Sequence, residues 1–202
     1  MAAITVSRQL GSLGTRLARR VARRLDYRLV WREVINEAAR RAGAPEAALA
    51  MIDDLGLLEV DLRPEAHRAY QNAVREVMED LVSEGDVVIV GRAGQVILGD
   101  HPDVLHVRVI APMPLRVERT ASIQSIPTAA ARAQVEQSDR TRRDYLEGVY
   151  GVDWEDPQLY DLVLNTGRLT AETGVALVCQ ALAQRVGGEV AEASSKGEHD
   201  LG

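Results

Sequence analysis

Phosphate-binding chemistry is suggested first by a glycine-containing segment near the N-terminus. The segment Ser7–Gly14 (SRQLGSLG) follows the β-branched run Ile4–Val6 and precedes an expected amphipathic helix. A loop between a buried strand and a helix presents backbone N–H groups and the positive end of the helix dipole, which attract phosphate. The complete pattern G-x-x-x-x-G-K-[ST] would need Gly, Gly, Lys and Ser/Thr at positions 8, 13, 14 and 15. At these positions the chain has Arg8, Leu13, Gly14 and Thr15. Only the last position matches, and an ordinary strand–helix connection is the alternative.

A second candidate phosphate contact follows a strand in the middle of the chain. Gly91 and Arg92 come directly after the continuous apolar run Val87–Val90. In open α/β sheets, ligands bind outside the carboxyl ends of the strands. An arginine at such an end can hold two phosphate oxygens through its planar guanidinium group. We therefore predict a phosphate contact at Arg92, with a surface ion pair as the alternative.

A third group of candidate residues is charged and lies in a helical pattern. The segment Asp139–Asp144 reads DRTRRD, and its residues Arg140 and Arg143 are spaced i, i+3, so they can share one face of a helix. Transfer of a phosphoryl group needs positioning and charge stabilisation, which guanidinium groups can supply. A solvated helix with ion pairs along its surface is the alternative interpretation.

Strands alternate with helices along the chain. Apolar and β-branched runs predict strands at Ile4–Val6, Val87–Val90, Val104–Ile110 and Tyr160–Leu164. Helical spacing predicts helices after Thr15, at about Arg32–Ala42, from about Pro64 to Leu81, after Pro114, from Thr128 to about Tyr150, and from Thr170 through Leu182. This alternation predicts an α/β fold in three layers, with a parallel sheet of about five strands and helices on both faces.

The composition is that of one ordinary globular domain. The chain has 202 residues, of which 46% are hydrophobic and 27% charged. Acidic residues outnumber basic ones by 30 to 24, and the net charge of −6 disfavours general nucleic-acid binding. The single cysteine, Cys179, excludes an internal disulfide, so we expect a cytoplasmic protein. No apolar run approaches the ~18 residues of a membrane span, so we expect no membrane partner.

Three motifs, in this order, resemble those of a known family. They are Ile4–Gly14 (ITVSRQLGSLG), Val87–Arg92 (VVIVGR) and Tyr160–Thr166 (YDLVLNT). The chain is similar over about residues 3–184 to the cytidylate kinase-like family, a branch of the phosphate-loop nucleoside monophosphate kinases. The family's motifs typically read S-R-Q-x-G-S-G-G, V-G-R and Y-D-L-V-x-N-T. The resemblance implies a monophosphate-kinase-like domain over residues 1–186, with a helical acceptor-binding insertion at about 32–84 and a lid at about 120–155. The composition of residues 187–202 predicts a disordered tail.

The resemblance also implies a reaction, in which the γ-phosphoryl group of ATP·Mg²⁺ passes to a nucleoside monophosphate, with CMP as the model acceptor. The residues expected to bind the ATP phosphates are Gly11, Ser12, Gly14, Thr15 and Arg16. The Thr15 hydroxyl is expected to ligate Mg²⁺, and Arg8 or Arg16 to supply the charge of the missing lysine. Arg92 and Asp139 are expected to bind the acceptor, and Arg140 and Arg143 to stabilise the transition state.

Departures from the family pattern leave a second interpretation open. Leu13 replaces a glycine of the family motif, Ala93 replaces the Asp of a related Gly-Arg-Asp motif, and Trp31 stands where relatives tend to carry an Asp. Gly14, which matches the family motif, occupies the position of the lysine in the standard phosphate-loop pattern. The one lysine, Lys196, lies in the predicted tail. The alternative is a weak or inactive pseudo-kinase that acts as a nucleotide-sensing or protein-binding module. Nucleic-acid binding through the basic first 45 residues is disfavoured by the acidic remainder of the chain.

Overall fold

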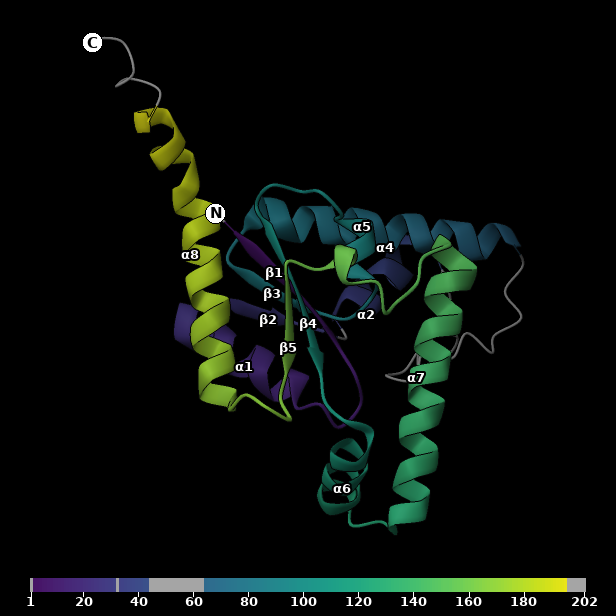
Figure 1. Ribbon diagram of the computed structural model, residues 1–202. Helices are drawn as coiled ribbons and strands as arrows, with labels where there is room; N and C mark the ends of the chain where they lie inside the picture. The colour runs from purple at the N-terminus through teal and green to yellow at the C-terminus, as the bar shows by residue number, and fades with distance from the viewer. Residues whose placement is uncertain (1, 32, 44–63, 196–202) are drawn as a thin grey trace.

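The computed structural model describes residues 2–31, 33–43 and 64–195 of the chain, and Figure 1 shows the order of its elements. The strands are β1 (Ala3–Arg8), β2 (Arg28–Val30), β3 (Val87–Val90), β4 (Val104–Ile110) and β5 (Leu162–Asn165). The helices are α1 (Gly14–Leu25), α2 (Glu33–Arg41), α4 (Pro64–Glu84), α5 (Gly94–Ile97), α6 (Met113–Gln124), α7 (Thr128–Tyr150) and α8 (Ala171–Ser195), with a 3-10 turn at Pro157–Leu159.

The strands form one parallel sheet in the order β2-β3-β1-β4-β5. The central strand β1 pairs with β3, where Val6 lies opposite Val90, and with β4, where Ser7 lies opposite Arg108. All residues of β3 are buried, as expected for an interior strand of a parallel sheet. The predicted α/β fold with a parallel sheet of five strands is confirmed.

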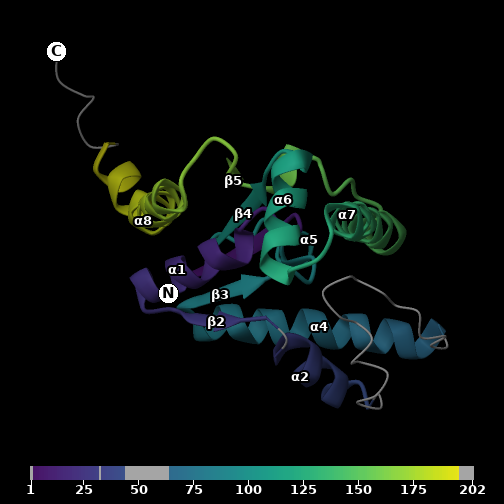
Figure 2. The same cartoon turned by 90° about the horizontal axis from the view of Figure 1, so that it is seen from below.

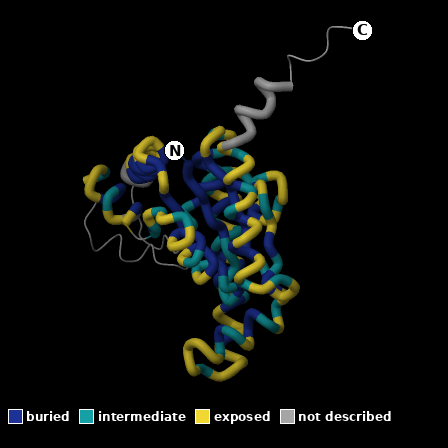
Figure 3. The backbone as a smooth tube through the Cα atoms, turned by 90° about the vertical axis from the view of Figure 1, so that its left-hand side faces the viewer, coloured by how far each residue is buried: buried dark blue, intermediate teal, exposed yellow. Residues whose placement is uncertain are grey.

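Helices cover both faces of the sheet (Figure 2). α1 and α8 pack on one face, where they contact Ile4 and Val6 of β1. α2, α4 and α5 pack on the other face, which Ala3 and the segment around Trp154 also help to bury. Successive side chains of a strand point to opposite faces, so each interior strand contributes to both cores. Figure 3 shows exposed residues concentrated where α6 turns into α7, away from these cores.

On the face that α5 covers, alternate positions of β1 and β4 are polar and buried. The residues are Thr5, Ser7, His106 and Arg108. Thr5 Oγ1 lies 2.6 Å from His106 Nδ1, and His106 Nε2 lies 2.7 Å from the carbonyl oxygen of Gly99. Both ring nitrogens therefore have a partner, and burial lowers the pKa of His106. This histidine is a neutral structural group of the core.

Most long elements begin and end near their predicted bounds. β3, β4 and α7 have the predicted ranges, whereas β5 begins two residues later than predicted. The short strand β2 and the single-turn helix α5 had not been predicted, because three or four residues carry too little periodicity. α7 and the last five residues of α6 lie within the range of about 120–155 predicted for the lid.

The insertion and the tail are described in part. The predicted insertion contributes α2 and α4, while its residues 44–63 lie outside the described part of the chain. α8 continues through Gly187 and Gly188 to Ser195, so the helix extends past the predicted start of the tail, and residues 196–202 are not described. Among the described residues, no helix has the length and apolar character needed to cross a bilayer.

Candidate phosphate-binding site

The carboxyl edge of the sheet brings together segments that are far apart in sequence. β1 ends at Arg8, Gly91 directly follows β3, and α1 begins at Gly14. The connection from β1 to α1 therefore consists of residues 9–13. Because β1 and β3 are neighbours in the sheet, the predicted phosphate-binding loop and the predicted contact at Arg92 follow adjacent strands.

The loop turns sharply and ends at a helix without a side-chain cap. Gly11 and Leu13 adopt left-handed backbone conformations, with φ of +77° and +64°. Ser12 is fully buried; its N–H donates to the carbonyl of Gln9 at 3.2 Å, and its Oγ accepts from the N–H of Gly14 at 3.3 Å. Leu13, the N-cap residue, makes no side-chain hydrogen bond to α1. The N–H groups of a first helical turn have no acceptor within the helix, so this end of α1 can bind an anion.

The first turn of α1 carries the predicted magnesium ligand and one candidate cation. The Thr15 side chain is half-buried and that of Arg16 is exposed. Glu172, at the start of α8, has a lowered pKa because its carboxylate accepts from its own backbone N–H and from Arg20, and Arg16 adds a weaker attraction. Arg16 thus lies on the α8 side of the helix.

Arg8 runs alongside Gly14 at the end of β1. A Cβ atom placed on Gly14 would lie 2.4 Å from Cβ and 3.1 Å from Cγ of Arg8. The far end of the side chain passes Gly91, where an added Cβ would lie 2.6 Å from Nη1 of Arg8. The guanidinium carbon is 5.2 Å from the centre of the Trp31 ring, a cation–π distance. The side chain of Arg8 therefore extends from the end of β1, over the end of β3, to Trp31, which directly follows β2.

Arg92 lies in a strained turn between α4 and α7. Gly91, Arg92 and Ala93 all have positive φ, of +78°, +60° and +54°. Left-handed backbone is unfavourable for arginine and alanine, and such strain often marks a functional site. Burial raises the pKa of Tyr70 to about 12 and also raises that of Tyr145, while the charge of Arg92 opposes both shifts. The guanidinium of Arg92 is thus close to a tyrosine from each helix.

Tyr70 is buried in the core on this side of the sheet, and Tyr145 and Tyr150 pack against that core and are partly buried. The rings of Tyr145 and Tyr150 meet edge to face, with centroids 6.0 Å apart. Burial is the main cause of the raised pKa at Tyr150, as at Tyr145, so both phenols stay protonated at neutral pH. Neutral aromatic groups beside an arginine suit a ligand that has a phosphate and a flat ring.

Asp139 of α7 is bound by an arginine that the sequence analysis did not select. Arg116 of α6 donates to both carboxylate oxygens of Asp139, at 3.0 and 2.7 Å, and only 4% of its side chain is exposed. Arg116 also donates to the carbonyl oxygens of Ala111 and Leu10, at 3.0 and 3.4 Å. A direct contact between Asp139 and an acceptor would have to compete with this buried pair, which ties α7 to α6 and to the loop.

Arg140 and Arg143 lie on the outer part of α7. Arg140 is exposed and donates to Gln137 at 3.0 Å, and Arg143 forms an ion pair with Glu155 at 3.4 Å. These partners come from α7 itself and from the segment after it. Within the described part of the chain, the structure gives neither arginine a hydrogen bond to residues 9–13. A role on a phosphoryl group would require these side chains to leave their present partners, Gln137 and Glu155.

The loop is held from its other side by residues that sequence reasoning missed. Arg119 of α6 donates to Oγ1 and to the carbonyl of Thr166, at 3.0 and 2.9 Å, and to the carbonyl of Gly11 at 3.4 Å. Thr166 Oγ1 in turn donates to the carbonyl of Ser12 at 2.7 Å. The signals were present, because Arg116 and Arg119 are spaced i, i+3 and Thr166 ends the third motif.

A buried arginine lies behind the loop. Arg108 of β4 stacks on the rings of Trp154 and Tyr160, with 4.2 and 5.3 Å from its guanidinium carbon to the ring centres. It donates to the carbonyl of Trp154 and, at 3.1 Å, to the Tyr160 hydroxyl. Trp154 Nε1 donates to Ser7 Oγ at 3.0 Å, one residue before Arg8. This group fixes the segment after α7 against the end of β1.

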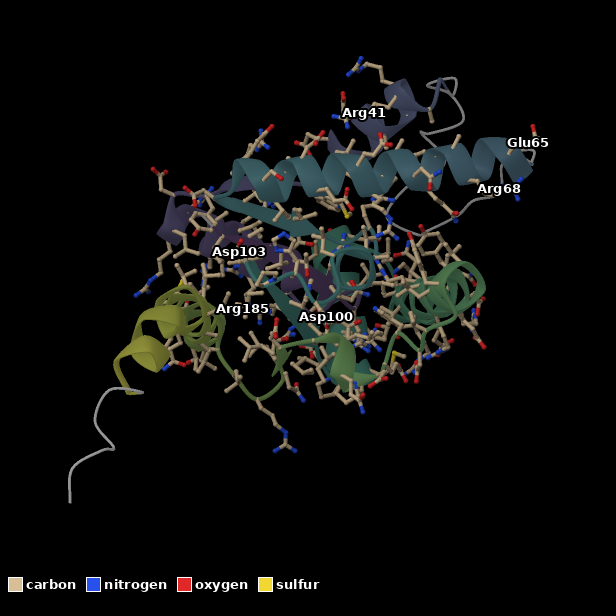
Figure 4. All side chains as sticks on the ribbon, turned by 90° about the horizontal axis from the view of Figure 1, so that it is seen from above. Arg41, Glu65, Arg68, Asp100, Asp103 and Arg185 are labelled. Atoms are coloured by element: carbon tan, nitrogen blue, oxygen red, sulfur yellow. The ribbon has the colours of Figure 1, made fainter. Side chains whose placement is uncertain are left out.

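A separate surface cavity of about 530 Å³ lies near the amino ends of β2 and β3. Arg41 of α2, which Figure 4 shows beside α4, forms ion pairs across it with Glu37 at 2.9 Å and Asp80 at 2.8 Å. The hydrogen bonds from Arg40 and Arg41 lower the pKa of Glu37 to about 2. The charges that line this cavity are paired with one another, and it is distant from the carboxyl edge.

Sequence comparisons give relatives that are named as kinases. A cytidylate kinase of Pyrococcus horikoshii is 28% identical over 162 residues, which cover 80% of this chain and 82% of the relative. A cytidylate kinase of Methanopyrus kandleri is 31% identical over 111 residues. A uronate isomerase of Corynebacterium glutamicum is 36% identical over 125 residues. The chain spans 58% of the length of the Methanopyrus protein and 24% of the length of the isomerase.

Solved structures share the fold. An uncharacterized protein from Eubacterium ventriosum superposes with a TM-score of 0.70 and 18% identity, over 90% of this chain and 98% of that protein. A shikimate kinase from Bacteroides thetaiotaomicron gives a TM-score of 0.53 at 12% identity, with the same coverage of each chain. The model of the cytidylate kinase-like family matches residues 3–168. Since that match contains the loop, the turn at Arg92 and all five strands, the chain belongs to the cytidylate kinase-like family.

Proposed function

We propose that this protein binds ATP with Mg²⁺ and transfers the γ-phosphoryl group to a nucleoside monophosphate, with CMP as the first acceptor to test. The observation that carries the proposal is the position of the loop. It connects the central strand to the uncapped start of α1, and two arginines, Arg8 and Arg92, lie at the same edge of the sheet. A fixed set of N–H groups and guanidinium groups favours the charge of a transferring phosphoryl group.

The donor phosphates are assigned to the loop and the first turn of α1. The N–H groups of Gly11, Leu13 and Thr15 would face the phosphates, with Arg16 at the rim. The N–H groups of Ser12 and Gly14 hold the turn instead, because they donate to the carbonyl of Gln9 and to Ser12 Oγ. Mg²⁺ prefers oxygen ligands and keeps several waters, and no group of three carboxylate, histidine or cysteine side chains that could hold a metal occurs in the described residues. The half-buried hydroxyl of Thr15 fits a metal that is held mainly by nucleotide phosphates. When bound, Mg²⁺ would neutralise charge on those phosphate oxygens.

The acceptor is assigned to the space beside Arg92. Its guanidinium would bind the monophosphate, and the neutral, partly exposed tyrosines of α7, Tyr145 and Tyr150, would contact the base. Asp139 would hold α7 in place through its ion pair with Arg116. Arg140 and Arg143 would stabilise the charge of the transferring phosphoryl group when α7 lies close to the bound nucleotides. The cytidine preference rests on the relatives alone, since Ala93 provides no side-chain hydrogen bond for a sugar or base.

A binding module without turnover is the second candidate, and Gly14 in place of the usual lysine favours it. The two candidates share a nucleotide site and differ in catalysis. A coupled assay with MgATP and CMP, dCMP, UMP or AMP, run beside calorimetric titration of MgATP, separates them. We expect ATP to bind no tighter than tens of micromolar, about −6 to −7 kcal/mol. Binding without turnover on all four acceptors would favour a nucleotide-sensing module. No binding at millimolar MgATP would exclude the kinase and leave a protein-binding module as the better account.

A further inference from the structure

Arg8 and Gly14 are complementary in space. The Cβ and Cγ atoms of Arg8 lie where a side chain at position 14 would begin, 2.4 and 3.1 Å from an added Cβ. The Cβ of Val109 lies 3.1 Å from the same point and closes the other side. A distance of 2.4 Å between two carbons is far inside van der Waals contact. The loop can therefore hold a long side chain at position 8 or at position 14, but not at both.

The standard phosphate-loop pattern has the opposite assignment. It places glycine at the position of Arg8 and lysine at the position of Gly14. In this chain the bulky cation and the glycine have exchanged positions across one small volume. The exchange keeps one cation beside the loop and moves its point of attachment from the start of α1 to the end of β1.

Two further residues direct the guanidinium of Arg8. Gly91 leaves room for it, because an added Cβ there would lie 2.6 Å from Nη1. The Trp31 ring, 5.2 Å from the guanidinium carbon, gives it a flat surface on which to stack. These residues follow β3 and β2, so the cation lies over the ends of adjacent strands, on the side of the loop that leads to Arg92.

We infer that Arg8 is the phosphate-binding cation of this loop, that it replaces the missing lysine by an exchange with position 14, and that Gly14, Gly91 and Trp31 are the residues that position it. This assignment rests on the proposed nucleotide site, to which it adds the side chain that binds phosphate. The chemical class that Arg8 recognises is the terminal phosphate of a nucleoside di- or triphosphate.

The test is an exchange cycle measured by calorimetric titration of MgADP, together with thermal unfolding of each variant. Arg8→Gly should weaken MgADP binding at least tenfold, in the range of a lost charge-assisted hydrogen bond. Gly14→Lys alone should weaken binding and lower Tm, because its Cβ strikes Arg8. The double variant Arg8→Gly/Gly14→Lys has the standard pattern at both positions and should regain affinity to within about threefold of the wild type. Arg19→Ala, an exposed arginine of α1, is the charge-matched control and should bind normally.

Trp31 is tested by conservative rescue. Trp31→Phe keeps an aromatic face and should bind MgADP nearly as well as the wild type, whereas Trp31→Leu should bind several-fold more weakly. Because Trp31 also packs against the core, Tm is measured for both variants, and affinities are compared at a temperature where both are folded. Equal affinity of Arg8→Gly and the wild type would overturn the exchange, as would a double variant that binds no better than Gly14→Lys. A wild-type protein that binds neither MgADP nor MgATP would overturn the proposed function itself, and the exchange with it.

Discussion

Gly11 shows how closely a single residue is constrained in this loop. An added Cβ would lie 2.4 Å from the carbonyl oxygen of Arg116, which is backbone, and the residue has a φ of +77°. Neither problem is relieved by rotating a side chain. The close approach lets α6 pack directly on the loop, so that Arg116 and Arg119 reach its carbonyl oxygens.

We therefore predict that Gly11→Ala destabilises the protein and weakens nucleotide binding together. The strain and the clash should cost about 1–3 kcal/mol, which lowers Tm by several degrees in thermal unfolding. Gly148→Ala is the matched control, because that glycine lies in α7 with nothing within 4 Å of its added Cβ. Its Tm should stay the same or rise, since alanine favours a helix. An unchanged Tm in Gly11→Ala would contradict the contact with α6.

At the scale of elements, α6 and α7 form a hairpin attached to the loop by buried charge. Arg116 and Asp139 are both largely buried, and removing one partner of such a pair leaves an uncompensated charge. The pair of Arg116 and Asp139 holds α7 to α6 and to the loop about halfway along α7, so any movement of α7 must keep this pair or break it. Arg140 and Arg143 are next to it and are partly exposed, so a small rotation of α7 changes their distance from the loop.

We predict that Arg140→Ala and Arg143→Ala each reduce kcat far more than they reduce stability. The loss of one charge-stabilising contact typically costs ~3 kcal/mol in the barrier, roughly a hundredfold in rate. Turnover and Tm should be measured together, with Arg132→Ala as the control, because Arg132 is an exposed arginine of the same helix that pairs with Glu136. Full activity in both variants would assign these arginines to the solvated surface of α7.

At the scale of the whole molecule, α8 has two parts. Its first turns pack on the sheet, where Val175, Val178 and Leu182 are buried. Arg185 donates to the carbonyl of Pro102 at 3.0 Å and pairs with Asp161 at 2.7 Å. Val186 is already 51% exposed, and the helix then extends beyond the edge of the sheet (Figure 1).

We predict that deletion of residues 187–202 leaves Tm unchanged within error. The last side chains of α8 known to contact the domain precede the cut, and the removed segment begins with two glycines, which are poor helix formers. Thermal unfolding of the full and shortened chains tests this. The matched truncation at residue 181 removes Leu182 and Arg185 and should lower Tm by several degrees. A similar loss on deletion of 187–202 would show that the end of α8 docks on the domain.

The long or strongly patterned elements could be predicted from the amino-acid sequence alone. The run Val87–Val90, the strand Val104–Ile110 and the helix Thr128–Tyr150 were predicted with the bounds that the structure gives. Hydrophobic periodicity is a local property of the sequence. It shows which face of an element is buried without showing which other element packs against that face. The loop after β1 could be located in the same way, since its glycines and the helix after it are consecutive in sequence.

Which elements pack against one another became clear from the folded structure. Three features join residues that are between 23 and 101 positions apart in sequence. They are the place of β1 between β3 and β4, the pairing of Asp139 with Arg116, and the hydrogen bonds from Arg119 to Thr166. The same holds for the course of Arg8 past Gly91 to Trp31. Such contacts depend on how the packed layers orient each strand end. The spacing of residues along the chain does not determine that orientation. The pattern at positions 8 and 14 indicated a missing lysine, and the packing of Arg8 against Gly14 showed that the two positions share one space.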